Sequence, residues 1–279
     1  MDKIHFLPSQ ERLRYFTDAA NQMGLVVPMI EKDYWVVWVL GQMFDLDELK
    51  DHLTFKGGTS LSKVYGLIKR FSEDVDLSIE KSFFGFADEK SPEQAKSRKQ
   101  RTLTLEKLST ACSQYIQNHL LKTLKEKFSK ELSSSEKWDL VVDETEVVVQ
   151  VLNVERTFWE KATILHQYAH LPADKKLLLR LSRHYYDFHC LLQAPTKHKA
   201  LAAQDLLGKV AHHKELYFPS AWAKYSLAKK GSLTLVPPDP ILKELEKDYE
   251  QMGQMFFEDP TPWGEVMASI RLFEEEFNF

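Results

Sequence analysis

The chain has 279 residues, of which 43% are hydrophobic and 28% are charged, and its formal net charge is −4. This composition is typical of a globular protein. The small net charge excludes a strong overall electrostatic field, so any nucleic-acid-binding surface must be a local basic patch. The two cysteines, Cys112 and Cys190, exclude a disulfide framework and suit a reducing compartment. The first ten residues lack the apolar stretch of a signal peptide, and no apolar run approaches a membrane span, so a cytoplasmic protein is expected.

The first half of the chain mixes helical spacing with short strand-like runs. Leu13, Phe16 and Ala20 share one face of the first expected helix, and a strongly apolar second helix follows Pro28. The expected elements of this half are helices over 9–22 and 29–44, a strand over 53–56, a helix over 59–68, a strand over 75–79, a long helix over 92–130, and a hairpin with strands over 139–143 and 146–152.

The second half is almost wholly helical in its spacing. Helices are expected over 154–170 and 176–193, and prolines between 237 and 240 mark a loop before two final helices. The sequence therefore predicts an α+β fold with two parts: a part with a small mixed sheet over 1–153, and a mostly helical part over 154–279.

The segment SEDVDLSI places two aspartates one residue apart on an expected strand. Asp74 and Asp76 then point to the same face, where two like charges repel unless a cation lies between them. Two carboxylates at this spacing can bind Mg²⁺. Enzymes that transfer phosphoryl or nucleotidyl groups use Mg²⁺ ions bound in this way to neutralise phosphate charge. A lone Asp-x-Asp is more often a solvated strand face.

The segment FKGGTSLSK precedes the aspartates and contains a glycine turn. Gly57 and Gly58 permit close approach of the backbone to a phosphate, and Thr59 and Ser60 follow at an expected helix start. Lys63 adds a positive charge one turn later. The spacing is not that of a P-loop, and a lone Gly-Gly is usually only a turn. The order of strand, glycine turn, helix and Asp-x-Asp strand is far more specific and favours a metal-dependent nucleotidyltransferase.

FKGGTSLSK and RFSEDVDLSI together resemble the nucleotidyltransferase toxins of the AbiEii/AbiGii family, within the DNA polymerase β-like superfamily. IEKDYWVVWVL, ERTFWEKATILH and SRHYYDFHCLL are similar to further segments of that family, so the resemblance covers most of the chain. It implies a nucleotidyltransferase fold for the part over 1–153, with the helical part over 154–279 completing the active-site cleft. It also implies a cytoplasmic Mg²⁺-dependent toxin of a toxin–antitoxin system that acts in abortive infection, or phage defence. Such a toxin transfers NMP from an NTP to an RNA acceptor, which in characterised relatives can be the 3′ end of tRNA. It also implies a cognate antitoxin from a neighbouring gene.

The resemblance assigns roles residue by residue. Asp74 and Asp76 match the metal-binding half of the first motif, Lys161 the lysine of the third motif and Asp187 the aspartate of the fourth; all four are candidate catalytic residues. The candidate NTP-binding residues are Lys56, Gly57, Gly58, Thr59, Ser60, Lys63, Ser72 and Arg183. The superfamily's third metal-binding carboxylate has no decisive match, and its candidates are Asp143, Glu146 and Glu155. The gap between Gly58 and Asp74 is also slightly longer than the superfamily pattern.

The downstream residues also have plain structural explanations. Lys161, at the edge of an apolar helix face, is expected to contact the triphosphate, although such a lysine usually extends to water. Asp187 is expected on one helix face with Arg180, Arg183 and His184, where it orients a lysine, a metal-bound water or an acceptor hydroxyl; the plain alternative is an ion pair between Arg183 and Asp187. The basic helix over 93–130 is either a solvated face or a track for an RNA backbone.

Three functions remain open from the sequence. The first is NMP transfer to RNA. The second is NMP transfer to a protein hydroxyl, as in AMPylation, which the same residues serve. The third is a non-catalytic nucleotide-binding module, against which the intact glycine turn, Asp-x-Asp pair and Lys161 argue.

Overall fold

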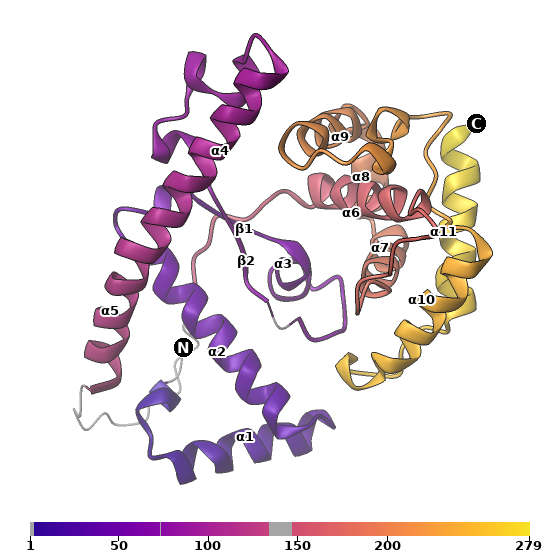
Figure 1. Ribbon diagram of the computed structural model, residues 1–279. Helices are drawn as coiled ribbons and strands as arrows, with labels where there is room; N and C mark the ends of the chain where they lie inside the picture. Colours follow the sequence, from indigo (N-terminus) through magenta and orange to yellow (C-terminus); the bar gives the residue numbers. More distant parts are fainter. Residues whose placement is uncertain (1–2, 73, 134–146) are drawn as a thin grey trace. The chain divides into compact units, whose positions relative to one another are not determined.

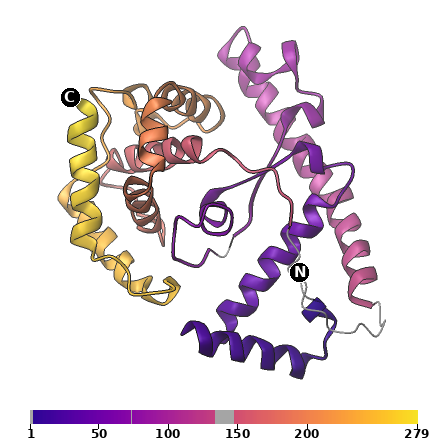
Figure 2. The same ribbon diagram turned by 180° about the vertical axis from the view of Figure 1, so that it is seen from behind.

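The computed structural model describes residues 3–72, 74–133 and 147–279. The chain divides into two compact units, each built from two stretches of sequence (Figures 1 and 2). The first contains Met1–Phe55 and Glu73–Gln150, and the second contains Lys56–Ser72 and Val151–Phe279. The division near residue 150 lies close to the predicted boundary at 153. It differs from the prediction in that the glycine turn and the residues that follow it group with the helical unit.

The first unit packs a two-stranded sheet and its helices around a small core. Helices α1 (Ser9–Met23) and α2 (Val27–Phe44) contact each other, and Pro28 lies in the first turn of α2, where its missing N–H costs no hydrogen bond. Strands β1 (Leu53–Lys56) and β2 (Asp76–Ile79) form the sheet. The buried core residues are Met43, Leu46, Leu49, Leu53 and Leu120, against which Leu77 and Ile79 of β2 pack.

The basic segment of the first unit forms one long helical run. Helix α4 (Arg98–Tyr115) continues through a π-helical turn (Ile116–Leu120) into α5 (Leu121–Ser133), so the long helix predicted over 92–130 begins later than expected, at Arg98, and is interrupted by this turn. The hydroxyl of Ser97 accepts from the backbone N–H of Gln100 at 3.2 Å and caps the start of α4. Helix α4 has no fully buried residue, but Tyr115 at its end and Leu124 of α5 pack against the small core.

The predicted hairpin after this run is only partly covered by the described residues. Its first strand and Glu146 lie outside them. Residues 147–150 form no strand, which contradicts the predicted second strand, although the carbonyl of Gln150 accepts from the N–H of Phe55 at 2.7 Å. Val151, in the same predicted strand, takes part in a β-bridge.

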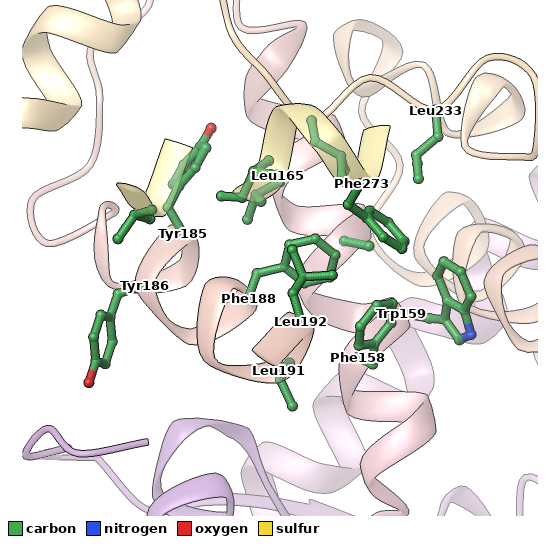
Figure 3. Packing of buried hydrophobic residues seen from close by; sticks show 14 of the residues in the cluster. Phe158, Trp159, Leu165, Tyr185, Tyr186, Phe188, Leu191, Leu192, Leu233 and Phe273 are labelled. Atoms are coloured by element: carbon green, nitrogen blue, oxygen red, sulfur yellow. The ribbon is translucent and has the colours of Figure 1, made fainter. Parts of the chain in front are cut away.

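The second unit is a helical assembly with one large core. Its helices are α3 (Gly57–Lys63), α6 (Val154–Ala169), α7 (Arg183–Gln193), α8 (Thr196–Ala202), α9 (Asp205–Tyr217), α10 (Asp239–Gln251) and α11 (Trp263–Asn278). Aromatic side chains from three of them meet at its centre (Figure 3): the ring of Phe158 on α6 lies 4.9 Å from that of Phe188 on α7 and 5.6 Å from that of Phe273 on α11. This core fixes α6 and α7 against each other.

Three helical predictions need correction. Leu13 of α1 is exposed, while Phe16 and Ala20 are buried as expected. The helix predicted over 59–68 ends at Lys63, and Val64 is exposed rather than turned inward. The helix predicted from 176 begins only at Arg183, because Arg180 has a left-handed backbone (φ +60°) that interrupts a right-handed helix.

A carboxylate distant in sequence sets the start of α7. Asp248 of α10 accepts from the backbone N–H groups of Arg180 (2.6 Å) and Ser182 (2.9 Å), and from the hydroxyl of Ser182 (2.6 Å). These are donors that a helix start leaves unsatisfied. The predicted face shared by Arg180 and Asp187 is therefore wrong, since Arg180 precedes the helix.

The α+β fold class is confirmed: the described residues combine helices with a two-stranded sheet. In the described part of the chain, no helix combines the length and the apolar character that crossing a membrane requires.

Candidate active site

The glycine turn opens α3, directly after β1. Gly57 has a left-handed backbone (φ +79°), a conformation that side chains disfavour. Gly58 is buried, and a Cβ built on it would lie 2.8 Å from Nη2 of Arg70 and 3.2 Å from Oγ of Ser72. Gly58 therefore leaves room for the buried side chain of Arg70. The approach of a phosphate was the only explanation of this glycine from the sequence, and the structure adds the space for Arg70 as a second explanation.

Arg70 is held in place by the last part of the second unit. Its backbone forms an isolated β-bridge with Phe256, and the neighbouring Phe71 N–H donates to the carbonyl of Met255 at 2.7 Å. Its guanidinium is buried, and it donates to both carboxylate oxygens of Asp187, from Nε to Oδ1 and from Nη2 to Oδ2, each at 2.7 Å. This two-point contact is the strongest geometry available to an arginine and a carboxylate.

Lys161 of α6 completes this network. Its ammonium donates to Oδ2 of Asp187 at 2.6 Å and to Nδ1 of His184 at 3.1 Å. Asp187 is fully buried and Lys161 nearly so. The structure thus brings together the predicted lysine and aspartate, and through Arg70 it joins them to the glycine turn. Asp187 holds Arg70 through both of its carboxylate oxygens and Lys161 through Oδ2, so it positions both cations.

The pKa directions follow from burial and from these contacts. Burial alone would raise the pKa of Asp187, but the positive charges of Arg70 and Lys161 overcome it and hold the pKa far below its ordinary value. Burial lowers the pKa of Lys161, opposed by Asp187 and aided by the nearby Arg70. Burial and the charge of Lys161 lower the pKa of His184 well below its ordinary value, so the ring is neutral at neutral pH. Because the Lys161 ammonium can only donate, its contact with Nδ1 assigns the ring proton of His184 to Nε2.

The other predicted NTP-binding residues lie in the same unit. Ser60 is buried and its hydroxyl donates to the carbonyl of Gly57 at 2.9 Å, within its own turn. Thr59 is also buried, Lys63 is exposed, and Lys56 and Ser72 are partly buried. Arg183 lies one residue before His184, and its charge lowers the pKa values of both Lys161 and His184.

Asp74 and Asp76 belong to the first unit. Both are exposed, and Val75 and Leu77 between and after them are less so, which confirms the alternation predicted for this segment, although β2 begins only at Asp76. Among the described residues, no group of three or more histidine, cysteine, aspartate or glutamate side chains is arranged to hold a metal ion. Two carboxylates on one face fit Mg²⁺, which is bound in nucleotide enzymes through one or two carboxylates and the substrate phosphates.

The third metal-binding carboxylate remains unassigned. Asp143 and Glu146 lie outside the described residues, while Glu155 is partly buried in the first turn of α6.

Sequence reasoning missed two cations of the second unit, Arg70 and Lys214. Arg70 lies in the quoted segment RFSEDVD, but its partner is 117 residues away, and periodicity carries no signal for such a pair. The absence of a Cβ at Gly58 was the one local hint. Lys214 lies on α9, and its Nζ donates to the backbone carbonyl of Glu160, the residue before Lys161, at 3.2 Å.

Gly58→Ala is expected to lower the free energy of unfolding by about 1–3 kcal/mol, because the new Cβ would displace an arginine that is fixed at both oxygens of a buried carboxylate. Urea unfolding measures the change. The matched control is Gly208→Ala in α9, where a Cβ meets nothing within 4 Å and where the loss of unfolded-chain entropy favours a small gain in stability. Equal stability of wild type and Gly58→Ala would show that Arg70 does not need this space.

Comparison with known proteins identifies the family. A family model described as nucleotidyl transferase AbiEii toxin, type IV TA system, matches residues 38–142 and 133–269. No curated protein and no solved structure gives a significant match. The matched stretches cover far more than half of the sequence and include the glycine turn, the aspartate pair, Lys161 and Asp187. The chain therefore belongs to the AbiEii family of nucleotidyl transferase toxins of type IV toxin–antitoxin systems.

Proposed function

We propose that the protein transfers NMP from an NTP to a hydroxyl of an RNA acceptor, the 3′ end of tRNA, in a Mg²⁺-dependent reaction. The acceptor oxygen forms a bond to the α-phosphorus, the bond from that phosphorus to the bridging oxygen of the β-phosphate breaks, and pyrophosphate leaves while the hydroxyl loses its proton. An amino acid can no longer be attached to a tRNA end that is capped in this way, so translation is blocked.

The observation that carries this proposal is the position of Lys161. An ammonium group has three N–H donors, and within the described residues Asp187 and His184 receive two of them. The remaining donor suits a phosphate oxygen. Because Asp187 and the neutral His184 fix its direction, Lys161 is set to offset the charge that develops on the β- and γ-phosphates as pyrophosphate leaves.

The aspartate pair supports the metal requirement. Asp74 and Asp76 would hold Mg²⁺, which when bound neutralises phosphate charge and favours ionisation of the attacking hydroxyl. Both carboxylates are exposed, so a hydrated ion and the phosphates of a nucleotide can reach them.

The basic helical run supports an RNA acceptor. Four cationic residues cluster at its start; three of them are exposed and Arg101 is partly buried, so the exposed three are available to a nucleic-acid backbone. The four are Lys96, Arg98, Lys99 and Arg101. A solvated face remains the alternative, and the salt dependence of RNA binding separates the two. The family also implies an antitoxin as a partner of the system.

The test is label transfer from each of the four NTPs in the presence of Mg²⁺, total tRNA and total protein. We expect label on tRNA, abolished by a chelator, and a loss of about 10²–10³-fold in rate for Lys161→Met. Lys243→Met, at an exposed position of α10, is the matched control and should keep the wild-type rate.

The outcomes are distinct. Label on polypeptide in place of RNA would select the AMPylation-type reaction. Absence of label from both acceptors with every NTP, in a folded preparation, would contradict nucleotidyl transfer and favour a non-catalytic module.

A further inference from the structure

Lys214 is a cationic side chain of the second unit to which neither the family motifs nor the proposed reaction assigns a role. It lies on α9, which packs against α6, and its ammonium donates to the backbone carbonyl of Glu160 at 3.2 Å. That acceptor carries no formal charge. The Glu160 carboxylate contributes an attraction, but its Oε1 also accepts from Nε of Arg156 at 3.3 Å. A lysine in this position is poorly compensated for the loss of water.

The groups around Lys214 place it in the same cationic neighbourhood as Lys161. Lys161 follows the residue whose carbonyl Lys214 contacts, and Lys56 precedes the glycine turn; both lie close enough to repel its charge. Burial, followed by these two lysines, lowers the pKa of Lys214 to about 7, against the attraction of Glu160.

The remaining titratable groups around α9 leave this balance unchanged. The short helix Tyr225–Leu227 also packs against α9; burial raises the pKa of Tyr225 to about 12, so this hydroxyl is neutral, and it donates to Gln167. On α9 itself, Lys209 pairs with Asp205 on the surface, and His213 stacks on Tyr217. The charges of Lys56 and Lys161, from two other segments of the chain, therefore both act on Lys214, while Asp187 already holds two cations, one of which is Lys161.

We propose that Lys214 is a third lysine of the triphosphate site, and that it takes up a proton as the polyanion binds. This inference rests on the proposed function, because it assumes that the phosphates lie beside Lys161. With the site empty, part of the protein population holds Lys214 neutral at physiological pH, which relieves the repulsion among the lysines. A bound triphosphate supplies the missing negative charge and makes the charged form favourable.

The sign of the pH dependence follows. Below about pH 7 Lys214 is already charged, and binding requires no proton at this residue. Above it, each binding event must first protonate the lysine, so affinity falls by up to tenfold per pH unit until the pKa of the bound state is reached.

The experiment is titration calorimetry of inorganic triphosphate with Mg²⁺ at pH 6 and pH 8, in pairs of buffers with different ionisation enthalpies. The variants are Lys214→Met and Lys214→Arg, with Lys243→Met as the surface control. Arginine stays charged at both pH values, so position 214 takes up no proton in Lys214→Arg. The proton uptake measured with this variant therefore belongs to the triphosphate and is the baseline for wild type. At pH 8 we expect wild type to take up about 0.9 proton more than Lys214→Arg, and at pH 6 about 0.1.

Affinity and stability provide independent readouts. Lys214→Met should bind triphosphate at least about tenfold more weakly than wild type at pH 6, with a smaller difference at pH 8. Without ligand, its melting temperature should equal or exceed that of wild type, because a partly buried lysine whose hydrogen-bond acceptor is a backbone carbonyl contributes little stability.

Equal proton uptake by wild type and Lys214→Arg at pH 8, or equal affinity of wild type and Lys214→Met at pH 6, would overturn the inference. The absence of triphosphate binding by folded wild type would overturn it as well. None of these readouts depends on nucleotidyl transfer. A wild type that binds as expected but labels no acceptor would therefore contradict the proposed function and leave Lys214 as a polyanion ligand.

Discussion

Replacing Asp187 by asparagine is expected to lower the free energy of unfolding by about 3–5 kcal/mol, because it leaves the buried Arg70 and Lys161 without their counter-charge. An amide presents one acceptor where the carboxylate presents two, so the two-point contact with Arg70 is lost as well. Nucleotidyl transfer should fall with it, since Lys161 loses the group that directs it. Urea unfolding and label transfer measure the two effects.

Asp205→Asn is the matched control. Asp205 accepts from Lys209 at 2.6 Å, the same distance as between Lys161 and Asp187, but both side chains are exposed. Solvent screens an exposed pair of this kind, so its loss should lower the free energy of unfolding far less than the loss of the buried Asp187 network. A loss of similar size in the two variants would contradict the conclusion that burial gives the Asp187 network its importance.

The pH dependence of the Asp187 effect has a defined sign. The pKa of the folded state is depressed below the ordinary value of 3.8, so the stabilisation is fully present above pH 3.8 and is lost as the pH falls through the folded-state pKa. The difference in unfolding free energy between wild type and Asp187→Asn should therefore be constant from pH 7 to about pH 4 and narrow below it. A difference that narrowed already between pH 7 and pH 5 would point to another titrating group.

Local sequence patterns predicted the parts of the fold that depend on neighbouring residues. The strand over 53–56 was placed at its observed ends, and the helix over 154–170 within one residue, because β-type alternation and helical apolar spacing are local properties. The same reasoning failed for the start of α7. There, Asp248 on α10 receives the N–H groups that precede the helix, and no pattern within residues 176–193 contains that partner.

The candidate site divides in the same way. The order of strand, turn and helix identified the glycine turn, the family resemblance identified Lys161 and Asp187, and the structure joins them. The connection itself was not predictable, because it runs through Arg70, whose partner is separated from it by 117 residues. Lys214 was missed for a related reason: a single lysine on an amphipathic helix has no distinguishing local pattern, and its burial follows from the packing of α9 on α6.

Asp74→Asn and Asp76→Asn are each expected to reduce nucleotidyl transfer by about three orders of magnitude or more, and to abolish growth inhibition of a host cell. The substitution keeps the shape of the side chain and removes the negative charge that a Mg²⁺ ligand requires. Both residues are exposed, so the free energy of unfolding should change by less than about 0.5 kcal/mol. The initial rate of label transfer and urea unfolding measure the two quantities.

Glu89→Gln, another exposed carboxylate of the first unit, is the control for loss of surface charge and should keep the wild-type rate. A toxic protein with either aspartate replaced would show that the metal assignment is wrong.

The double variant tests whether the two aspartates act as one site. If both bind the same ions, removal of either already destroys the site, so the double variant should be no slower than the slower single variant. Independent contributions would instead multiply, and the double variant would lose the product of the two single effects. Two carboxylates on the same face of a strand repel each other, and a cation bound by both offsets this repulsion. If the rate losses of the two single variants multiply in the double variant, Asp74 and Asp76 do not act through one shared metal site.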